Sequence, residues 1–138
     1  MKKQQPLISN DPEKLDVSFM HHFLTNSYWA KGRSIEEVKA CIKNSLNFGL
    51  YLNDRQIGYA RVLTDYVYFA YVLDVFIDES HRGLGYATLL MSYIIENPSL
   101  QKIKIWRLAT DDAHGLYAKV GFKALKDPHK MMERINNR

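Results

Sequence analysis

The chain has 138 residues, of which 46% are hydrophobic and 25% are charged. This composition is that of one ordinary globular domain and excludes a disordered chain. No apolar run approaches the ~20 residues that a membrane-spanning helix needs, so no membrane partner is expected. The net charge of +4 is dispersed without a dense Lys/Arg run, which argues against a nucleic-acid partner and suits a protein that holds a small polyanion. Cys41 is the only cysteine, which excludes an intrachain disulfide and indicates the cytoplasm.

Two amphipathic helices are predicted in the first third of the chain, over residues 15–29 and 34–46. Both segments repeat apolar residues near helical spacing. Ser34 followed by Glu37 is the capping-box pattern that starts a helix, because each side chain can bond the backbone N–H of the other residue. The segment NSYWAKGRS, which overlaps the end of the first predicted helix and leads to the second, is the connecting loop and carries aromatic and basic residues.

Three strands follow these helices. Residues 48–53 and 56–65 are apolar runs joined by Asn53 and Asp54, which predicts a hairpin with a tight turn. Residues 69–78 are apolar on both faces of the expected strand, which predicts a position inside the sheet.

The second half alternates helices and strands. A helix is predicted from residue 87 to about residue 96, ended by Pro98, and a strand over residues 102–110. A short helix over residues 112–120 is closed by Gly121 as a left-handed cap. Weaker strands are expected over residues 122–126 and 130–135. We therefore predict one α/β (α+β) domain over residues 1–138, with helices covering a central sheet.

The junction between the third strand and the next helix has the features of an anion site. Arg82, Gly83 and Gly85 stand directly before the helix. The first helical turn offers unpaired N–H groups and the positive end of the helix dipole, and glycines let a ligand approach the backbone. The spacing matches neither a P-loop nor a dinucleotide fingerprint. An ordinary tight turn that needs glycine only for its geometry is the alternative.

Two motifs carry a family resemblance. The segment RGLGYA, with Arg82, Gly85 and Ala87, resembles the Arg/Gln-x-x-Gly-x-Gly/Ala acyl-CoA motif of the GNAT superfamily of N-acetyltransferases. Downstream, LYAKVGF is similar to that family's L-Y-x-x-x-G-F segment, with Tyr117 and Gly121 in place. The resemblance covers about residues 51–125. It implies a mixed, mostly antiparallel central sheet that is splayed at the middle, with helices on both faces.

The resemblance also implies acetyl-CoA as co-substrate and no metal. The pantetheine arm would pair with the backbone near Val75 and Ile77, and Thr110 stands where relatives often carry an asparagine that touches it. The implied pyrophosphate-binding residues are Arg82, Gly83, Leu84, Gly85, Tyr86, Ala87 and Thr88.

In such enzymes an amine attacks the thioester directly, and an acid protonates the departing thiolate. Tyr117 fits the acid by resemblance, since a phenol is protonated at neutral pH; packing alone is its alternative role. Asp74 is a candidate base if burial raises its pKa, whereas pairing with an arginine such as Arg61 would make it structural. Other candidates for the base are Glu79, Asp112 and His114, and a water chain can replace an assigned base.

The acceptor is expected to be a primary amine of a small molecule. Relatives form the acceptor site with the first two helices and their connecting loop, where Tyr28, Trp29 and Arg33 lie. A non-catalytic CoA-binding sensor or interaction module is the alternative function. A homodimer is compatible with the resemblance. The aromatic residues that line the same cleft or fill the sheet face are Tyr66, Tyr68, Phe69 and Tyr71.

Overall fold

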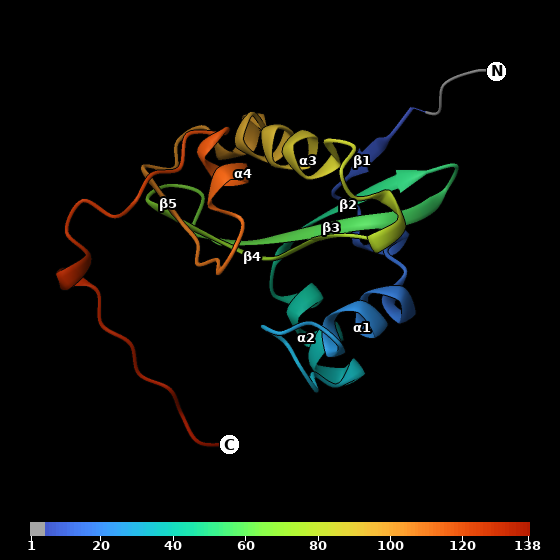
Figure 1. Ribbon diagram of the computed structural model, residues 1–138, viewed down its shortest axis with the longest axis horizontal. Coiled ribbons are helices and arrows are strands. Elements are labelled where there is room, and N and C mark those ends of the chain that lie inside the picture. Colours follow the sequence, from blue (N-terminus) through green and yellow to red (C-terminus); the bar gives the residue numbers. More distant parts are fainter. Residues whose placement is uncertain (1–4) are drawn as a thin grey trace.

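A sheet of five strands in the order β1-β2-β3-β4-β5 forms the centre of the protein (Figure 1). The computed structural model describes residues 5–138. The strands are β1 (Leu7–Ser9), β2 (Leu46–Leu52), β3 (Arg55–Thr64), β4 (Phe69–Ile77) and β5 (Ile105–Arg107). The helices are α1 (Val17–Thr25), α2 (Ile35–Lys43), α3 (Tyr86–Ile95) and α4 (His114–Ala118).

Strands β1 to β4 pair antiparallel, and β4 pairs with β5 in parallel. The predicted hairpin of β2 and β3 is confirmed: Asn53 and Asp54 occupy its turn with positive φ angles of 49° and 64°. Such angles suit the right-handed twist of a hairpin, and Asn and Asp tolerate them better than most residues. The mixed, mostly antiparallel sheet matches the expected fold class.

The helices form a layer on each face of the sheet (Figure 1). Helices α1 and α2 pack on one face, and the core there contains Met20, Leu24, Val38, Tyr59 and Phe76. Helix α3 packs on the other face, and the core there includes Phe48, Val62, Val72, Leu90 and Met91. The capping box of Ser34 and Glu37 is present at the start of α2, with both reciprocal hydrogen bonds.

Strand β4 carries a bulge at Asp74. Arg61 lies opposite Leu73 while Tyr59 lies opposite Phe76, so β4 has one residue more than β3 between these pairs. Asp74 accommodates the extra residue in a left-handed conformation, with φ of 54°. A bulge re-aims the side chains that follow it. As a result Phe76 joins the core against α1 instead of facing α3.

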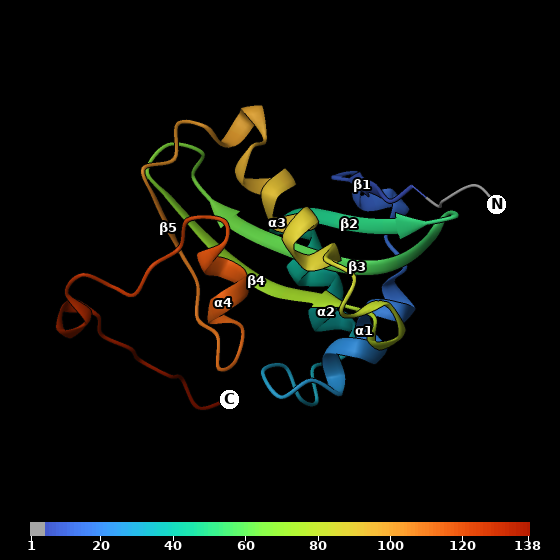
Figure 2. The same cartoon turned by 45° about the horizontal axis from the view of Figure 1, so that its top comes forward.

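The C-terminal strands predicted over residues 122–126 and 130–135 are absent: this prediction is wrong. Residues Phe122–Arg138, here called the C-terminal arm, leave α4 beyond β5 and contain only a short 3-10 turn (Figure 2). Within the described part of the chain, residues 5–138, no strand lies beside this strand-like sequence to pair with it. Strand β5 is also shorter than predicted, and β1 was not foreseen because three residues show no usable alternation.

Candidate active site

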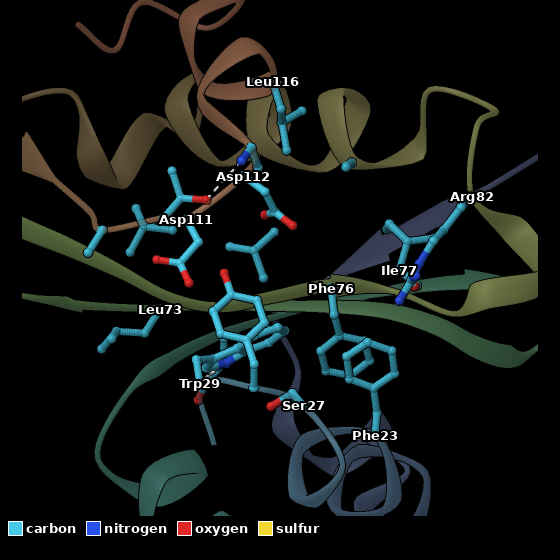
Figure 3. A pocket seen from close by; sticks show the side chains of 18 of the residues that line it. Phe23, Ser27, Trp29, Leu73, Phe76, Ile77, Arg82, Asp111, Asp112 and Leu116 are labelled. Atoms are coloured by element: carbon cyan, nitrogen blue, oxygen red, sulfur yellow. Dashed lines mark hydrogen bonds between the residues drawn. The ribbon is translucent and has the colours of Figure 1, made fainter. Parts of the chain in front are cut away.

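The sheet opens between β4 and β5. Their ladder joins only Phe69–Tyr71 to Ile105–Arg107, and β4 continues to Ile77 without β5 beside it. A cleft of about 1090 Å³ occupies this opening. It is lined by the end of α1 and the α1–α2 loop, by β4, and by the β5–α4 loop with α4 (Figure 3). The splay places unpaired strand backbone on the wall of a cleft.

The glycine junction forms a second cavity of about 360 Å³ beside the first. Gly83 and Gly85 have φ angles of 77° and 84°, and a Cβ built on either would meet nothing within 4 Å. Gly85 is the N-cap of α3, and no side chain caps the first turn. The amides that begin α3 are therefore open to a ligand, as an anion site requires. The cavities share Ile77, Arg82 and Ala87 in their linings, so they adjoin.

Most of the residues implied for the carrier line one of these cavities. Val75 and Thr110 line the cleft, whereas Leu84 lines neither cavity and is largely exposed. Thr110 also has a structural role, because its Oγ1 accepts a hydrogen bond from Ala113 N at 3.1 Å at the start of α4. The residues that line the smaller cavity are Ile77, Arg82, Gly83, Gly85, Tyr86, Ala87 and Thr88, with His81, Leu116 and Lys119.

Arg82 lies across the point where the two cavities meet. Its Nε donates to the carbonyl oxygen of Ile77 at 3.2 Å, and its guanidinium lies over the ring of Phe23, 5.8 Å from the centroid (Figure 3). Phe23 in turn stacks on Phe76 at 4.0 Å with an interplanar angle of 9°. The aromatic pair and the arginine form one wall of the cleft. Phe23 was not among the predicted site residues, although it lies four residues after Phe19 in the predicted first helix, the spacing of one helix face.

Tyr117 is buried and lines the cleft from α4. Burial, with smaller contributions from the nearby Tyr28 and Asp112, raises the pKa of its phenol to about 12. Tyr28 is on the α1–α2 loop, so the loop and α4 face each other across the cleft. Tyr117 also packs edge-on against Phe122, with ring centroids 5.9 Å apart. The phenol is thus both packed and accessible from the cleft, and it stays protonated at neutral pH.

Asp74 forms a buried ion cluster at the floor of the cleft. Arg33 Nη1 and Arg61 Nε each lie 2.6 Å from its Oδ2, and Trp29 Nε1 donates to Oδ1 at 3.0 Å. Burial by itself raises the pKa of this carboxyl, but the hydrogen bonds and charges of the two arginines outweigh it and lower the pKa below 3.8. The carboxylate is held ionised and fully engaged, which opposes a role as general base and agrees with the alternative of pairing with Arg61.

Two other carboxylates point into the cleft without a cationic partner. Asp111 and Asp112 stand on the β5–α4 loop and face the cleft (Figure 3). Among residues 5–138, no ion pair involves either side chain. Glu79 also lines the cleft, whereas His114 does not. Of the aromatic set in the β3–β4 region, only Tyr71 lines the cleft.

A model for the acetyltransferase (GNAT) domain matches residues 43–124, more than half of the chain. The chain belongs to the GNAT acetyltransferase family. A candidate acetyltransferase of Gibberella zeae is 26% identical to it, over 88% of this chain and 81% of its own length. An uncharacterised N-acetyltransferase of Prochlorococcus marinus is 31% identical, over 68% of this chain and 54% of its own length.

Solved structures agree with this membership. A candidate GNAT acetyltransferase from Xanthomonas campestris pv. campestris is 41% identical and superposes with a TM-score of 0.92, over 96% of this chain and 94% of that one. A predicted acetyltransferase from Clostridium acetobutylicum, solved with acetyl-CoA, shares the fold at 14% identity, with a TM-score of 0.67 over 97% and 96% of the two chains.

Two further properties bear on this GNAT protein's site. Within residues 5–138, no group of three or more His, Cys, Asp or Glu side chains is placed to hold a metal ion. No helix in the same range has the length and apolar character to cross a bilayer.

Proposed function

We propose that this GNAT protein transfers an acetyl group from acetyl-CoA to a primary amine of a small molecule by direct attack. One observation carries the proposal: the open amides of α3 and the buried phenol of Tyr117 lie along two adjoining cavities. An anion-binding end and a protonated acid are thus joined by a continuous path. Acyl transfer from a phosphorylated carrier needs both.

The residues present fit acetyl-CoA. The glycines before α3 leave space that a Cβ would fill, and the bare helix terminus favours a pyrophosphate. Strand β4 beyond Tyr71 has no β5 neighbour, so its backbone can pair with the pantetheine amides as a sheet edge pairs with a peptide. The clostridial neighbour solved with acetyl-CoA supports the same assignment.

The reaction forms an amide bond and breaks a thioester. The lone pair of a neutral amine attacks the thioester carbonyl carbon, and the carbonyl oxygen becomes an oxyanion that a β4 backbone N–H near Ile77 stabilises. Collapse breaks the carbon–sulfur bond. Tyr117 gives its proton to the departing thiolate, and the attacking nitrogen loses a proton through water or a cleft carboxylate. Acetylated amine and CoA with a free thiol are the products.

The acceptor end of the cleft suits a small cationic amine. Asp111 and Asp112 form no ion pair with any residue from 5 to 138, and their charge attracts an ammonium group. The indole and phenol rings of Trp29 and Tyr71 offer faces for the apolar part of the amine. The negative charge of Asp112 raises the pKa of Tyr117, so this carboxylate interacts electrostatically with the phenol. Asp112 is therefore a better candidate than Asp74 for the group that receives the amine proton.

The test is a thiol-release assay with acetyl-CoA and a panel of diamines, monoamines and amino acids, with product masses measured. We expect thiol release that depends on the amine, with a mass gain of one acetyl group and a preference for cationic amines. CoA binding in calorimetry without thiol release for any amine would favour the alternative, a CoA-binding sensor or interaction module. Absence of both binding and release would reject the site altogether.

A further inference from the structure

The ion cluster at the floor of the cleft contains more positive than negative charge. Arg33 and Arg61 both bond the carboxylate of Asp74, so two cations face one anion. Arg61 is the inner partner, because its Nη1 also donates to Ser45 Oγ at 3.3 Å and its side chain does not line the cleft. Arg33 does line the cleft. The surplus positive charge therefore belongs to the arginine that a ligand can reach.

Arg33 keeps one edge of its guanidinium available. Its Nη1 donates to Asp74, and among residues 5–138 no hydrogen bond involves its Nε or Nη2. Both nitrogens are accessible, because Tyr51 Oη is the one buried side-chain nitrogen or oxygen without a partner in that part of the chain. The Arg33 side chain is only 18% exposed, so water screens its charge poorly. Nε and Nη2 together form the edge that binds a carboxylate through two parallel hydrogen bonds.

The acceptor end of the cleft thus has charges of opposite sign on opposite walls. Asp111 and Asp112 lie on one side of the strands, and Trp29 lies on the other (Figure 3). Trp29 bonds the same carboxylate as Arg33, which places the surplus cation on the Trp29 side. A purely cationic molecule is attracted by one wall and repelled by the other. A molecule with an ammonium group at one end and a carboxylate at the other complements both walls.

Aromatic side chains line the space between the two charged walls. Trp29 packs edge-on against Tyr28, with ring centroids 5.1 Å apart. Tyr28 is close enough to Tyr117 to contribute to the raised pKa of its phenol. The rings therefore extend from the Arg33 end of the cleft to the end where acyl transfer is proposed. They offer an apolar surface for a hydrocarbon chain between the ammonium group and the carboxylate.

We infer that the acceptor is an amine that also carries a carboxylate, with an apolar chain between the two groups. The inference rests on the proposed function, since it names the acceptor class of that same reaction. Arg33 binds the carboxylate along its Nε–Nη2 edge, and the chain lies on Trp29 and Tyr28. The amine then lies beside Tyr117 and Asp112. Chemically, ω-amino acids and the side-chain amines of basic amino acids belong to this class.

The first test compares amines that differ only in the carboxylate. The matched pairs are β-alanine and propylamine, γ-aminobutyrate and butylamine, and δ-aminovalerate and pentylamine, in which a methyl group replaces the carboxylate. Thiol release from acetyl-CoA gives kcat/KM for each. We expect the carboxylate to raise kcat/KM at least about tenfold in the best pair, and cadaverine, with an ammonium group in its place, to be a poorer acceptor than δ-aminovalerate. Equal or lower values for the carboxylate in every pair overturn the inference.

Binding separates this inference from the proposed reaction. The same pairs are titrated into the protein in the presence of CoA, and calorimetry is expected to show tighter binding of the aminocarboxylate. Thiol release with pentylamine as readily as with δ-aminovalerate, and equal binding of the two, would leave the reaction standing and reject the carboxylate site. Tighter binding of the aminocarboxylates without thiol release for any amine would support the site and reject the reaction.

The second test is the variant Arg33→Gln. Asp74 keeps Arg61 as its partner, so no buried charge is left alone and circular dichroism is expected to report an unchanged fold. We expect the preference for the carboxylate, the ratio of kcat/KM within a pair, to fall to about one, and Arg33→Lys to keep part of it because the charge remains without the planar fork. Arg55→Gln removes the same charge at an exposed position outside both cavities and is expected to keep the full preference. A full preference in folded Arg33→Gln overturns the assignment to Arg33, and the comparison of wild-type substrates does not depend on this variant.

Discussion

Arg61 and Asp74 form a buried ion pair between β3 and β4, with Arg61 Nε 2.6 Å from Asp74 Oδ2, and both side chains are 10% exposed or less. The pair lies at the bulge, where Asp74 adopts its left-handed backbone. Arg33 brings a second guanidinium to the same oxygen from the α1–α2 loop. The cluster thereby ties the loop that faces the acceptor end to the centre of the sheet.

Asp74→Asn is expected to destabilise the fold. Removing one partner of a buried ion pair leaves the other charge uncompensated and costs about 3–5 kcal/mol. Urea unfolding followed by circular dichroism measures the change. Asp54→Asn, in the exposed hairpin turn, is the matched control and is expected to alter stability by about 0.5 kcal/mol or less. A small effect for Asp74→Asn with a large loss of turnover would restore Asp74 as the base.

The ion cluster around Asp74 also makes the stability of the fold depend on pH in the acid range. The pKa of Asp74 in the folded protein is below its ordinary value of 3.8, so the folded state binds this proton less readily than the unfolded chain does. The stability that the cluster contributes is therefore present above about pH 4 and is lost as the pH falls through the folded pKa. Asp74→Asn is expected to flatten this part of the stability curve, which unfolding at a series of pH values from 5 downward measures.

Gly85→Glu is expected to weaken CoA binding at least about tenfold, or about 1.4 kcal/mol, because the carboxylate would occupy the anion site. Gly32→Glu is the matched control. Gly32 has a φ of 80° beside 84° for Gly85, and neither meets an atom within 4 Å of a built Cβ. The backbone cost of about 1–2 kcal/mol is thus shared. Calorimetric titration with CoA measures the affinity of each variant. Equal CoA affinities for Gly85→Glu and Gly32→Glu would show that the pyrophosphate binds elsewhere.

Tyr117→Phe is expected to lower kcat by about 10²-fold or more while CoA affinity is unchanged, since only the proton for the leaving thiolate is removed. Tyr93→Phe, on the half-exposed side of α3, lies outside both cavities and is expected to turn over like the wild type. Steady-state thiol release measures kcat, and titration with CoA measures the CoA affinity. Unchanged turnover in Tyr117→Phe would leave this residue with its packing role alone.

Asp112→Asn is expected to raise the KM for a cationic amine about tenfold, by loss of one charged contact, with the KM for acetyl-CoA unaffected. If Asp112 also receives the amine proton, kcat falls as well and regains part of its value at higher pH. Asp127→Asn, on the exposed arm, removes the same charge far from the cleft. An unchanged KM for every amine in the panel would remove Asp112 from the acceptor site.

The protein is expected to unfold at alkaline pH, above pH 10.0, as its buried tyrosines ionise. Burial raises the pKa of Tyr51 and of Tyr117 from 10.0 to about 12, and raises that of Tyr59 further. Their folded pKa values exceed the unfolded ones, so their contribution to stability is complete below pH 10.0 and is lost as the pH rises through the folded values. Absorbance at alkaline pH is expected to show these three tyrosines ionising together with loss of circular dichroism.

Local patterns predicted the elements that depend on neighbouring residues. The Ser34 capping box, the Asn53–Asp54 turn and the cap at Gly121 were each readable from a few adjacent letters, and each is present. The glycine junction before α3 was readable for the same reason, because a left-handed backbone restricts which residues can stand there.

Features that depend on distant residues were not readable. The arm was predicted as strands because its apolar content satisfies a strand pattern, yet a strand needs a neighbouring strand to pair with, and residues 5–138 place none beside the arm. The cluster of Trp29, Arg33 and Asp74 joins residues about 40 positions apart, as the separations of 41 and 45 show. Phe23 reaches the cleft only because α1 crosses the end of β4. Such contacts follow from packing, which a single sequence does not reveal.

The extra residue at the Asp74 bulge reverses, along β4, which face of the sheet the odd-numbered side chains occupy. Upstream, odd-numbered side chains such as Tyr71 face the α1–α2 layer; downstream, the even-numbered Phe76 does. A deletion of one residue here would restore a uniform alternation and exchange the two hydrophobic layers over the rest of the strand. Redesign of this protein by transplanting β4 must therefore conserve the count of residues between Leu73 and Phe76, whatever their identity.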